Sequence, residues 1–153
     1  MNIKFLGFIL ISAIGLLGYQ LFSSEDIASQ YQSNRIEATP EHHAELVNLS
    51  KIIQNNLAEK NYRFLEQCFH MKATDRQIYK YNNQTDPVTE SMEVLKNTEG
   101  RIVWDQPKSF TFDKSPRKFE LELATSNKKE QILVKFYKLK NGYYIESITA
   151  KTL

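Results

Sequence analysis

The chain opens with a long apolar segment. Residues 5–22 (FLGFILISAIGLLGYQLF) carry no charged side chain, and Gln20 is the only strongly polar residue among them. An α-helix needs about 20 apolar residues to cross a hydrocarbon core of about 30 Å, although about 17 to 25 are tolerated. The segment therefore predicts one membrane-spanning helix, and we expect residues 1–24 to form an N-terminal membrane anchor.

The charges on either side of the apolar segment predict its orientation. Lys4 precedes the segment, whereas Glu25 and Asp26 follow it. Positive charge tends to remain on the cytoplasmic side of a membrane. We therefore expect a single pass through the inner (cytoplasmic) membrane, with the N-terminus inside and the remaining chain in the periplasm or outside the cell.

Two other interpretations of residues 1–24 are open. Signal peptides are cleaved after small residues at the last and third-last positions. Cleavage after Ser24 would place Phe22 at the third-last position, and cleavage after Ser23 would place Leu21 there. Because neither side chain is small, the sequence favours an uncleaved anchor over a cleaved signal or a buried helix of a soluble protein.

The residues after the anchor are numerous enough for one hydrophobic core. Residues 25–39 are polar and predict a linker, so we expect residues 40–153 to form a single extracytoplasmic domain. Cys68 is the only cysteine, which excludes an intramolecular disulfide. Its apolar neighbours Leu65 and Phe69 predict that Cys68 is a small buried side chain.

Charge is distributed unevenly along the chain. Residues 25–100 contain 8 lysines and arginines against 12 acidic residues, whereas residues 101–153 contain 11 against 6. Such an asymmetry can orient a protein partner. Nucleic-acid-binding domains show a dense basic stripe and a pI above about 9, and this chain has neither, since its pI is about 8.5. We therefore expect no nucleic-acid partner.

The first part of the domain has helical periodicity. Thr39 followed by Pro40 is typical of a helix start, and apolar residues then recur at helical spacing to Leu57. We expect helices over about residues 40–60, 62–71 and 87–96, the last one capped by Asp86. Residues 72–86 predict a polar connection that is anchored by Tyr79 and Tyr81.

After Gly100 the apolar period changes from 3.6 to 2, which predicts strands. The expected strands cover residues 101–104, 109–112, 118–125, 131–139 and 143–150. Asn141-Gly142 is a strong signal for a two-residue hairpin turn. Helices followed by an antiparallel meander predict an α+β domain, with helices packed on one face of a bent, cone-like sheet.

This order of elements resembles the nuclear transport factor 2-like superfamily, a cone-shaped fold also grouped with cystatin-like domains. The matching segments are residues 57–62 (LAEKNY), 64–69 (FLEQCF) and 133–145 (LVKFYKLKNGYYI), and the resemblance covers about residues 41–150. A single membrane helix before such a domain is similar to the assembly subunits of type IV secretion and conjugation machines. The resemblance implies a membrane-anchored, extracytoplasmic member of the superfamily.

The sequence offers little catalytic chemistry. Enzymes of the resembled fold place a polar dyad between sheet and helices, but Phe119, Leu121 and Leu123 would fill that space here. The opposite register would bury Glu120 and Glu122, whose charges would then need partners. The three histidines and Cys68 lack the spacing of a metal site. We expect no enzymatic activity, no cofactor and no metal.

Aromatic residues gather in the basic part of the chain. One interpretation is a core with ordinary sheet-face aromatics, and the other is an exposed aromatic and basic face that binds a protein. The candidate partner-binding residues are Trp104, Lys135, Tyr137, Tyr144 and Glu146.

Together these features predict a non-catalytic interaction or assembly module of a cell-envelope complex, related to secretion or conjugation. It would bind the membrane through residues 5–22 and would bind other envelope proteins or itself. The alternative is an extracytoplasmic small-molecule or lipid-binding protein with a pocket between sheet and helices.

Overall fold

The computed structural model describes residues 35–112 and 115–153. Residues Ile36–Leu153 form a compact unit. The predicted anchor, its orientation and linker residues 25–34 lie outside the described residues. No helix within residues 35–112 and 115–153 is both long and apolar enough to cross a bilayer.

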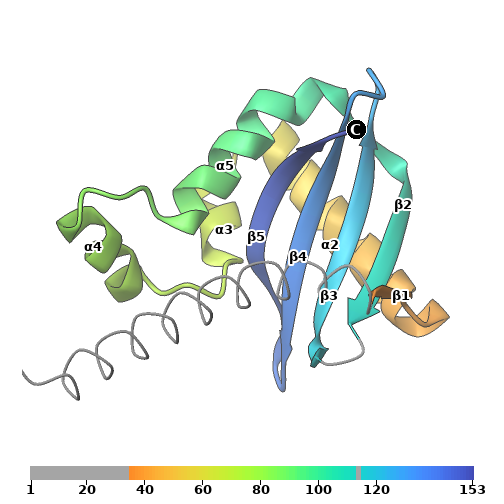
Figure 1. Cartoon of the computed structure of the whole chain (residues 1–153), viewed down its shortest axis with the longest axis horizontal. Helices are drawn as coiled ribbons and strands as arrows, with labels where there is room; N and C mark the ends of the chain where they lie inside the picture. The colour runs from red at the N-terminus through yellow and green to blue at the C-terminus, as the bar shows by residue number, and fades with distance from the viewer. Residues whose placement is uncertain (1–34, 113–114) are drawn as a thin grey trace, which may run out of the picture. The chain divides into compact units, whose positions relative to one another are not determined.

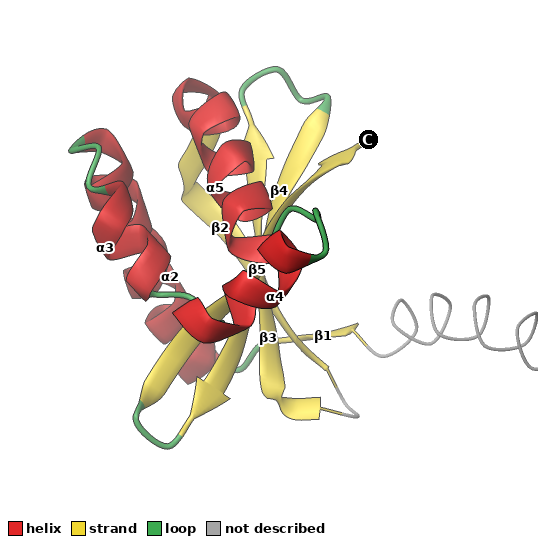
Figure 2. Ribbon diagram, turned by 90° about the vertical axis from the view of Figure 1, so that its left-hand side faces the viewer, coloured by secondary structure: helices red, strands yellow, loops and turns green. Residues whose placement is uncertain are grey.

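The compact unit is an α+β domain, as predicted (Figure 1). Its strands form a five-stranded sheet in the order β1-β2-β3-β4-β5, and β2 to β5 pair as an antiparallel meander. Helices α2, α3 and α5 cover one face of this sheet (Figure 2). The helices are α2 (Pro40–Ala58), α3 (Tyr62–Gln67), α4 (Ala73–Tyr81) and α5 (Pro87–Thr98), followed by the 3₁₀ turn η1 (Glu99–Arg101). The strands are β1 (Arg35–Glu37), β2 (Ile102–Phe112), β3 (Ser115–Thr125), β4 (Glu130–Leu139) and β5 (Gly142–Thr152).

Local sequence signals explain where the two longest helices begin. Thr39 Oγ1 accepts the N–H of His42 at the start of α2. Asp86 Oδ1 accepts the N–H groups of Val88 and Thr89, both at 3.0 Å, at the start of α5. Each helix has a proline in its first turn, where the missing N–H costs nothing. Both predicted starts are therefore confirmed.

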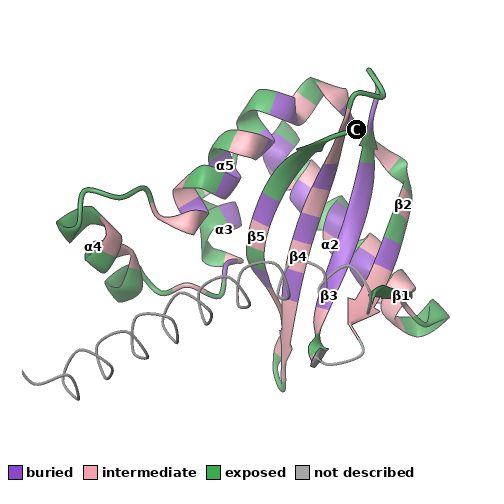
Figure 3. Ribbon diagram, in the orientation of Figure 1, coloured by how far each residue is buried: buried purple, intermediate pink, exposed green. Residues whose placement is uncertain are grey.

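The hydrophobic core lies between the sheet and the helices (Figure 3). The predicted strand register is confirmed, because Leu121 and Leu123 of β3 face Val134 and Ile132 of β4, and all four are fully buried. Glu120 and Glu122 lie on the opposite, outer face of the sheet, as expected. They are nevertheless buried, and Glu122 Oε1 accepts a hydrogen bond from Gln131 Nε2 at 3.0 Å.

The β4–β5 connection follows the sequence signal. The two strands turn at Asn141 and Gly142, and Gly142 has φ +140°, a backbone conformation that other residues rarely adopt. Further along the pair, Lys135 faces Ser147 while Phe136 faces Ile145. Glu146 is therefore an extra residue in β5, and this bulge bends the strand.

The edge of β5 is covered rather than open. The N–H of Ile145 donates to Cys68 O at 2.8 Å, and the N–H of His70 donates to Ile145 O at 2.9 Å. The N–H of Ile148 donates to Ser91 Oγ of α5 at 2.9 Å. The connection between α3 and α4, together with α5, thus satisfies backbone groups that would otherwise invite another strand.

Three predictions about the elements were wrong. Residues 73–81 form helix α4 instead of a polar connection, and Tyr81, a predicted anchor, is 90% exposed. The expected strands 101–104 and 109–112 are one strand, β2, with a break in register between Val103 and Lys108. Arg35–Glu37, within the expected linker, form strand β1.

We predict that Ser91→Ala lowers the free energy of unfolding by about 1–3 kcal/mol, because it leaves the buried N–H of Ile148 without an acceptor. Ser50→Ala is the matched control. Ser50 is equally buried in α2, but its hydroxyl donates within its own helix, to Val47 O. Urea denaturation of both variants measures the difference, and an equal loss in the two would contradict this role of Ser91.

Candidate functional site

Four of the five candidate residues lie together on the outer face of the sheet. Lys135 and Tyr137 belong to β4, and they alternate with the buried residues Val134 and Phe136. Tyr144 of β5 pairs directly with Tyr137, and the bulged residue Glu146 follows it. The alternation of a half-buried strand therefore brings these side chains to one face.

Trp104 does not join the other candidates. It lies on β2, which is separated from β4 by β3, and its partly buried side chain packs against the hydrophobic core. Trp104 therefore remains a separate candidate, away from the surface that the other four form. Trp104 lies next to the break in the β2 register, so the alternation of side chains along the strand does not predict which face of the sheet it occupies.

His70 is the residue that sequence reasoning missed. Its ring centroid lies 5.4 Å from that of Tyr137 and 6.1 Å from that of Tyr144. The hydrogen bond from its backbone N–H to Ile145 O holds it beside β5. Lys118 Nζ donates to Glu146 Oε1 at 2.9 Å across the same face. We call His70, Lys118, Tyr137, Tyr144 and Glu146 the tyrosine cluster.

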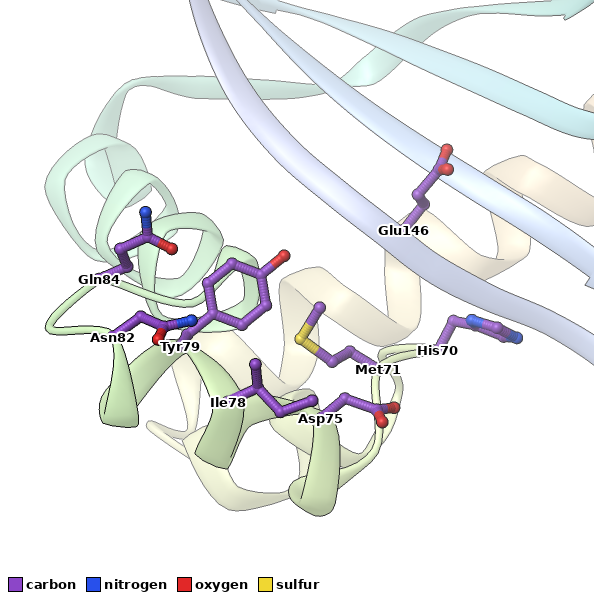
Figure 4. Close-up of a pocket in the computed structure, with 8 residues that line it drawn as sticks. All are labelled: His70, Met71, Asp75, Ile78, Tyr79, Asn82, Gln84 and Glu146. Carbon is purple, nitrogen blue, oxygen red and sulfur yellow. The ribbon is translucent and has the colours of Figure 1, made fainter.

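Two cavities adjoin the tyrosine cluster. The first, of about 500 Å³, lies between α4 and β5, with Ile78 and Tyr79 of α4 on one side and Glu146 on the other (Figure 4). The second, of about 590 Å³, lies between the connection from α3 to α4 and the β4–β5 hairpin, where Leu139 and Tyr144 line it. His70 and Met71 line both cavities.

Arg76 connects α4 to α3 and to the start of α5. Its Nη1 donates to Glu66 Oε2 of α3 at 3.0 Å, and its Nη2 donates to Thr89 Oγ1 of α5 at 3.2 Å. Its Nε lies 3.0 Å from Asp86 Oδ1, the N-cap of α5. Burial opposes the charge of Arg76, but the hydrogen bond to Glu66 and the charge of Asp86 outweigh this and raise the Arg76 pKa.

Helix α4 is otherwise loosely attached to the domain. None of its residues is buried. It extends to the side of the sheet, beyond α3 (Figure 1). Ile78 is 61% exposed and Tyr81 is 90% exposed, so no described element covers these two side chains of α4.

A second polar cluster joins the start of α2 to the β4–β5 hairpin. Glu45 Oε2 accepts hydrogen bonds from Tyr143 OH at 2.6 Å and from Lys138 Nζ at 3.2 Å. His42 Nδ1 lies 2.9 Å from Tyr143 OH and 3.2 Å from Glu45 Oε2. Because the tyrosine hydroxyl donates to Glu45, its oxygen can accept from His42, which assigns the hydrogen to Nδ1.

Two members of this second cluster, Glu45 and Tyr143, have pKa values far from neutral pH. The hydrogen bond from Tyr143, with those from His42 and Lys138, lowers the pKa of Glu45 to about 2. Burial, together with the hydrogen bond to Glu45, raises the pKa of Tyr143 to about 12. General acid–base catalysis works best when the pKa lies near the operating pH. Whatever protons it exchanges, the cluster connects α2 to the hairpin, because Glu45 bonds both Tyr143 and Lys138.

A serine–histidine pair lies beside this link. His43 Nδ1 is 2.7 Å from Ser109 Oγ. Ser109 is buried, and within residues 35–112 and 115–153 no carboxylate contacts His43 to orient its ring. Both residues line a cavity of about 370 Å³, but the described part of the chain supplies no carboxylate as the third member of a catalytic triad.

The described part of the chain shows no group of three histidine, cysteine or acidic side chains that could hold a metal ion. Cys68 is a free, partly buried thiol, and burial raises its pKa, which makes it a poor nucleophile. A scan against protein-family models and searches of curated proteins and of solved structures found no match to this chain.

We predict that Tyr143→Phe raises the pKa of Glu45 from about 2 towards its ordinary value, because Tyr143 is its strongest hydrogen-bond donor. The low pKa of Glu45 stabilises the fold above the ordinary carboxyl pKa, and this stabilisation is lost as the pH falls towards 2. An NMR titration of the Glu45 carboxyl group measures the shift. Tyr144→Phe is the control, since the Tyr144 hydroxyl contacts Asn141 instead, and an equal shift in both variants would disprove the assignment.

We predict that Arg76→Gln loosens α4 without unfolding the domain. Hydrogen bonds between charged groups contribute about 1.5–3 kcal/mol, so amide exchange in residues 73–81 should become at least about tenfold faster. The midpoint of global unfolding should change little, because α4 has no buried residues. Lys80→Gln removes an equal charge from α4 without breaking an ion pair among the described residues. Similar exchange in both variants would argue against a special role of Arg76.

Proposed function

We propose that this chain is a non-catalytic, membrane-tethered interaction module of a cell-envelope complex. Residues 5–22 hold it in the inner membrane, and the α+β domain lies outside the cytoplasm. The domain binds another envelope protein through the surface formed by α4 and the tyrosine cluster. We further propose that the domain is a member of the nuclear transport factor 2-like superfamily, related to the assembly subunits of secretion or conjugation machines.

The observation that carries this proposal is the exposed apolar surface of α4 beside the tyrosine cluster. Ile78 and Tyr81 are 61% and 90% exposed, although they are large apolar or aromatic side chains. Tyrosine and methionine are enriched in protein interfaces, and Tyr79, Tyr144 and Met71 line the adjoining cavities. Arg76 holds α4 in position before binding, which reduces the conformational entropy that the domain loses when a partner binds.

The chemistry of the domain supports binding over catalysis. The space between sheet and helices is filled by hydrocarbon side chains, among which Leu46, Leu121 and Val134 are fully buried. The carboxyl and phenol groups with strongly shifted pKa values, Glu45 and Tyr143, are shifted away from neutrality. Neither observation favours a site that moves protons.

The small-molecule alternative draws support from the two cavities. Their volumes of about 500 and 590 Å³ fall within the range of ligand pockets, about 300–1,000 Å³. Native mass spectrometry of protein purified in detergent would distinguish this alternative. A co-purifying ligand would favour it, if that ligand also slows hydrogen exchange of the backbone amides of His70 and Tyr144.

The proposal predicts a protein crosslink from α4. A photoreactive benzoylphenylalanine in place of Tyr81 should form one dominant adduct with a second protein in native membranes, because Tyr81 lies on the exposed surface of α4. The control replaces Lys128, an exposed residue in the turn between β3 and β4. Adducts of equal yield at both positions, or none from Tyr81, would contradict the proposed surface.

A further inference from the structure

The two cavities beside the tyrosine cluster carry opposite charges. The charged residues that line the first cavity are Asp75 and Glu146, which are both acidic. The second cavity is lined by the basic residues Arg63, Lys72 and Arg76, and Glu66 is the one acidic residue among its described lining. The surface proposed above for a partner is therefore divided into an acidic side and a basic side.

The basic side has charge available for a ligand. Arg76 is already engaged by Glu66 and Asp86. Arg63 and Lys72 are exposed, and neither forms an ion pair with any residue in the described part of the chain. Two cations beside the apolar side chains of Phe69 and Leu139 are suited to an acidic residue that is followed by an apolar one.

The acidic side offers the complementary pair. Asp75 accepts the backbone N–H of Lys72 at 3.3 Å, and Glu146 pairs with Lys118 at 2.9 Å. Each carboxylate keeps further acceptor sites, because it has two oxygens and about four lone-pair positions. Among the described residues no lysine or arginine lines this cavity, whose remaining lining includes the side chains of Ile78 and Tyr79.

The two cavities share a boundary. Met71 and His70 line both cavities, and the His70 ring lies 5.4 Å from the ring of Tyr137. A segment that passes from one cavity to the other must cross this boundary. An apolar side chain on that segment would contact Met71, whose flexible thioether adapts to different shapes.

We infer that the partner presents a charge-ordered peptide segment, with acidic residues at one end, apolar residues in the middle and basic residues at the other end. The acidic end binds Arg63 and Lys72, the apolar middle crosses Met71 and His70, and the basic end binds Asp75 and Glu146. This inference rests on the proposed function and names the chemistry of its partner. The basic side offers two cations without an ion pair among the described residues, and the acidic side offers Asp75 and the free acceptor sites of Glu146, which is paired with Lys118. Several charged groups on each side fit a peptide better than a zwitterionic lipid headgroup with one charge of each sign.

Selection of peptides from a random dodecapeptide display library tests the inference. The full chain is held in a lipid nanodisc, and empty nanodiscs remove peptides that bind lipid. We expect the enriched peptides to contain acidic and basic residues separated by apolar ones, in one preferred order. Enriched peptides with only apolar residues, or with one sign of charge, would overturn the inference.

Charge variants then test the assignment of the two sides with one enriched peptide, measured by fluorescence anisotropy. Arg63→Glu/Lys72→Glu should weaken binding at least about tenfold, and changing the acidic residues of the peptide to glutamine should no longer weaken it further. Asp75→Asn/Glu146→Gln should also weaken binding at least about tenfold, and changing the basic residues of the peptide to glutamine should then not weaken it further. The control, Lys128→Glu/Lys129→Glu, changes two exposed lysines at the turn between β3 and β4. Equal affinity of all variants, or displacement of the peptide by phosphoethanolamine, would overturn the inference.

The peptide selection and the crosslinking experiment can fail independently of each other. A crosslink from position 81 without any enriched peptide would retain the interaction module and reject the charge-ordered segment. Enriched peptides without a crosslink in native membranes would reject the proposed function. Circular dichroism of each variant confirms that a loss of binding does not come from unfolding.

Discussion

The hydrogen bonds of Arg76 are the interaction on which the proposed binding surface depends. Helix α4 has no buried residue, so hydrophobic packing does not hold it in place. Arg76 instead connects α4 to Glu66 of α3 and to Asp86 and Thr89 at the start of α5. Because the guanidinium group is planar and always charged, it can hold three acceptors in a defined geometry. The first cavity exists because α4 stands away from β5 in this position.

The body of the domain gives this surface a rigid support. The helix-facing residues of β3 and β4 are fully buried against α2 and α5, and the Glu45 cluster ties the start of α2 to the β4–β5 hairpin. The edge of β5 is bonded to Cys68 and His70, which fixes the connection that lines both cavities. The bulge at Glu146 places a carboxylate beside the first cavity. A rigid domain that carries an exposed helix is suited to binding a protein partner.

The sequence predicted the elements whose signals are local. The starts of α2 and α5 follow from Thr39-Pro40 and Asp86-Pro87, and the last hairpin follows from Asn141-Gly142. Helix α4 escaped prediction because its nine residues are mostly polar and none of them is buried. The two halves of β2 were separated because Asp105, Gln106 and Pro107 interrupt the alternation at the break in register.

The candidate site was predictable only in part. Strand alternation placed Lys135, Tyr137 and Tyr144 on one face, since the side chains of a strand point alternately to its two faces. His70 reaches the same face through a parallel bridge between Phe69 and Ile145, which no local pattern indicates. Glu45 and Tyr143 are 98 positions apart in sequence and meet only through tertiary packing. Because the register of β2 breaks next to Trp104, strand alternation does not predict whether its side chain shares a face with the tyrosines.

The most direct measurement of the central claim is the accessibility of α4 in intact cells. A single cysteine at Ile78, in a Cys68→Ser background, is compared with a single cysteine at Lys128 by labelling with a membrane-impermeant maleimide. The account predicts that position 128 reacts in intact cells, because we propose that the domain lies outside the cytoplasm. It also predicts that position 78 is protected in cells and reacts only after purification in detergent. Equal labelling of the two positions in cells, or labelling of neither before lysis, would contradict it.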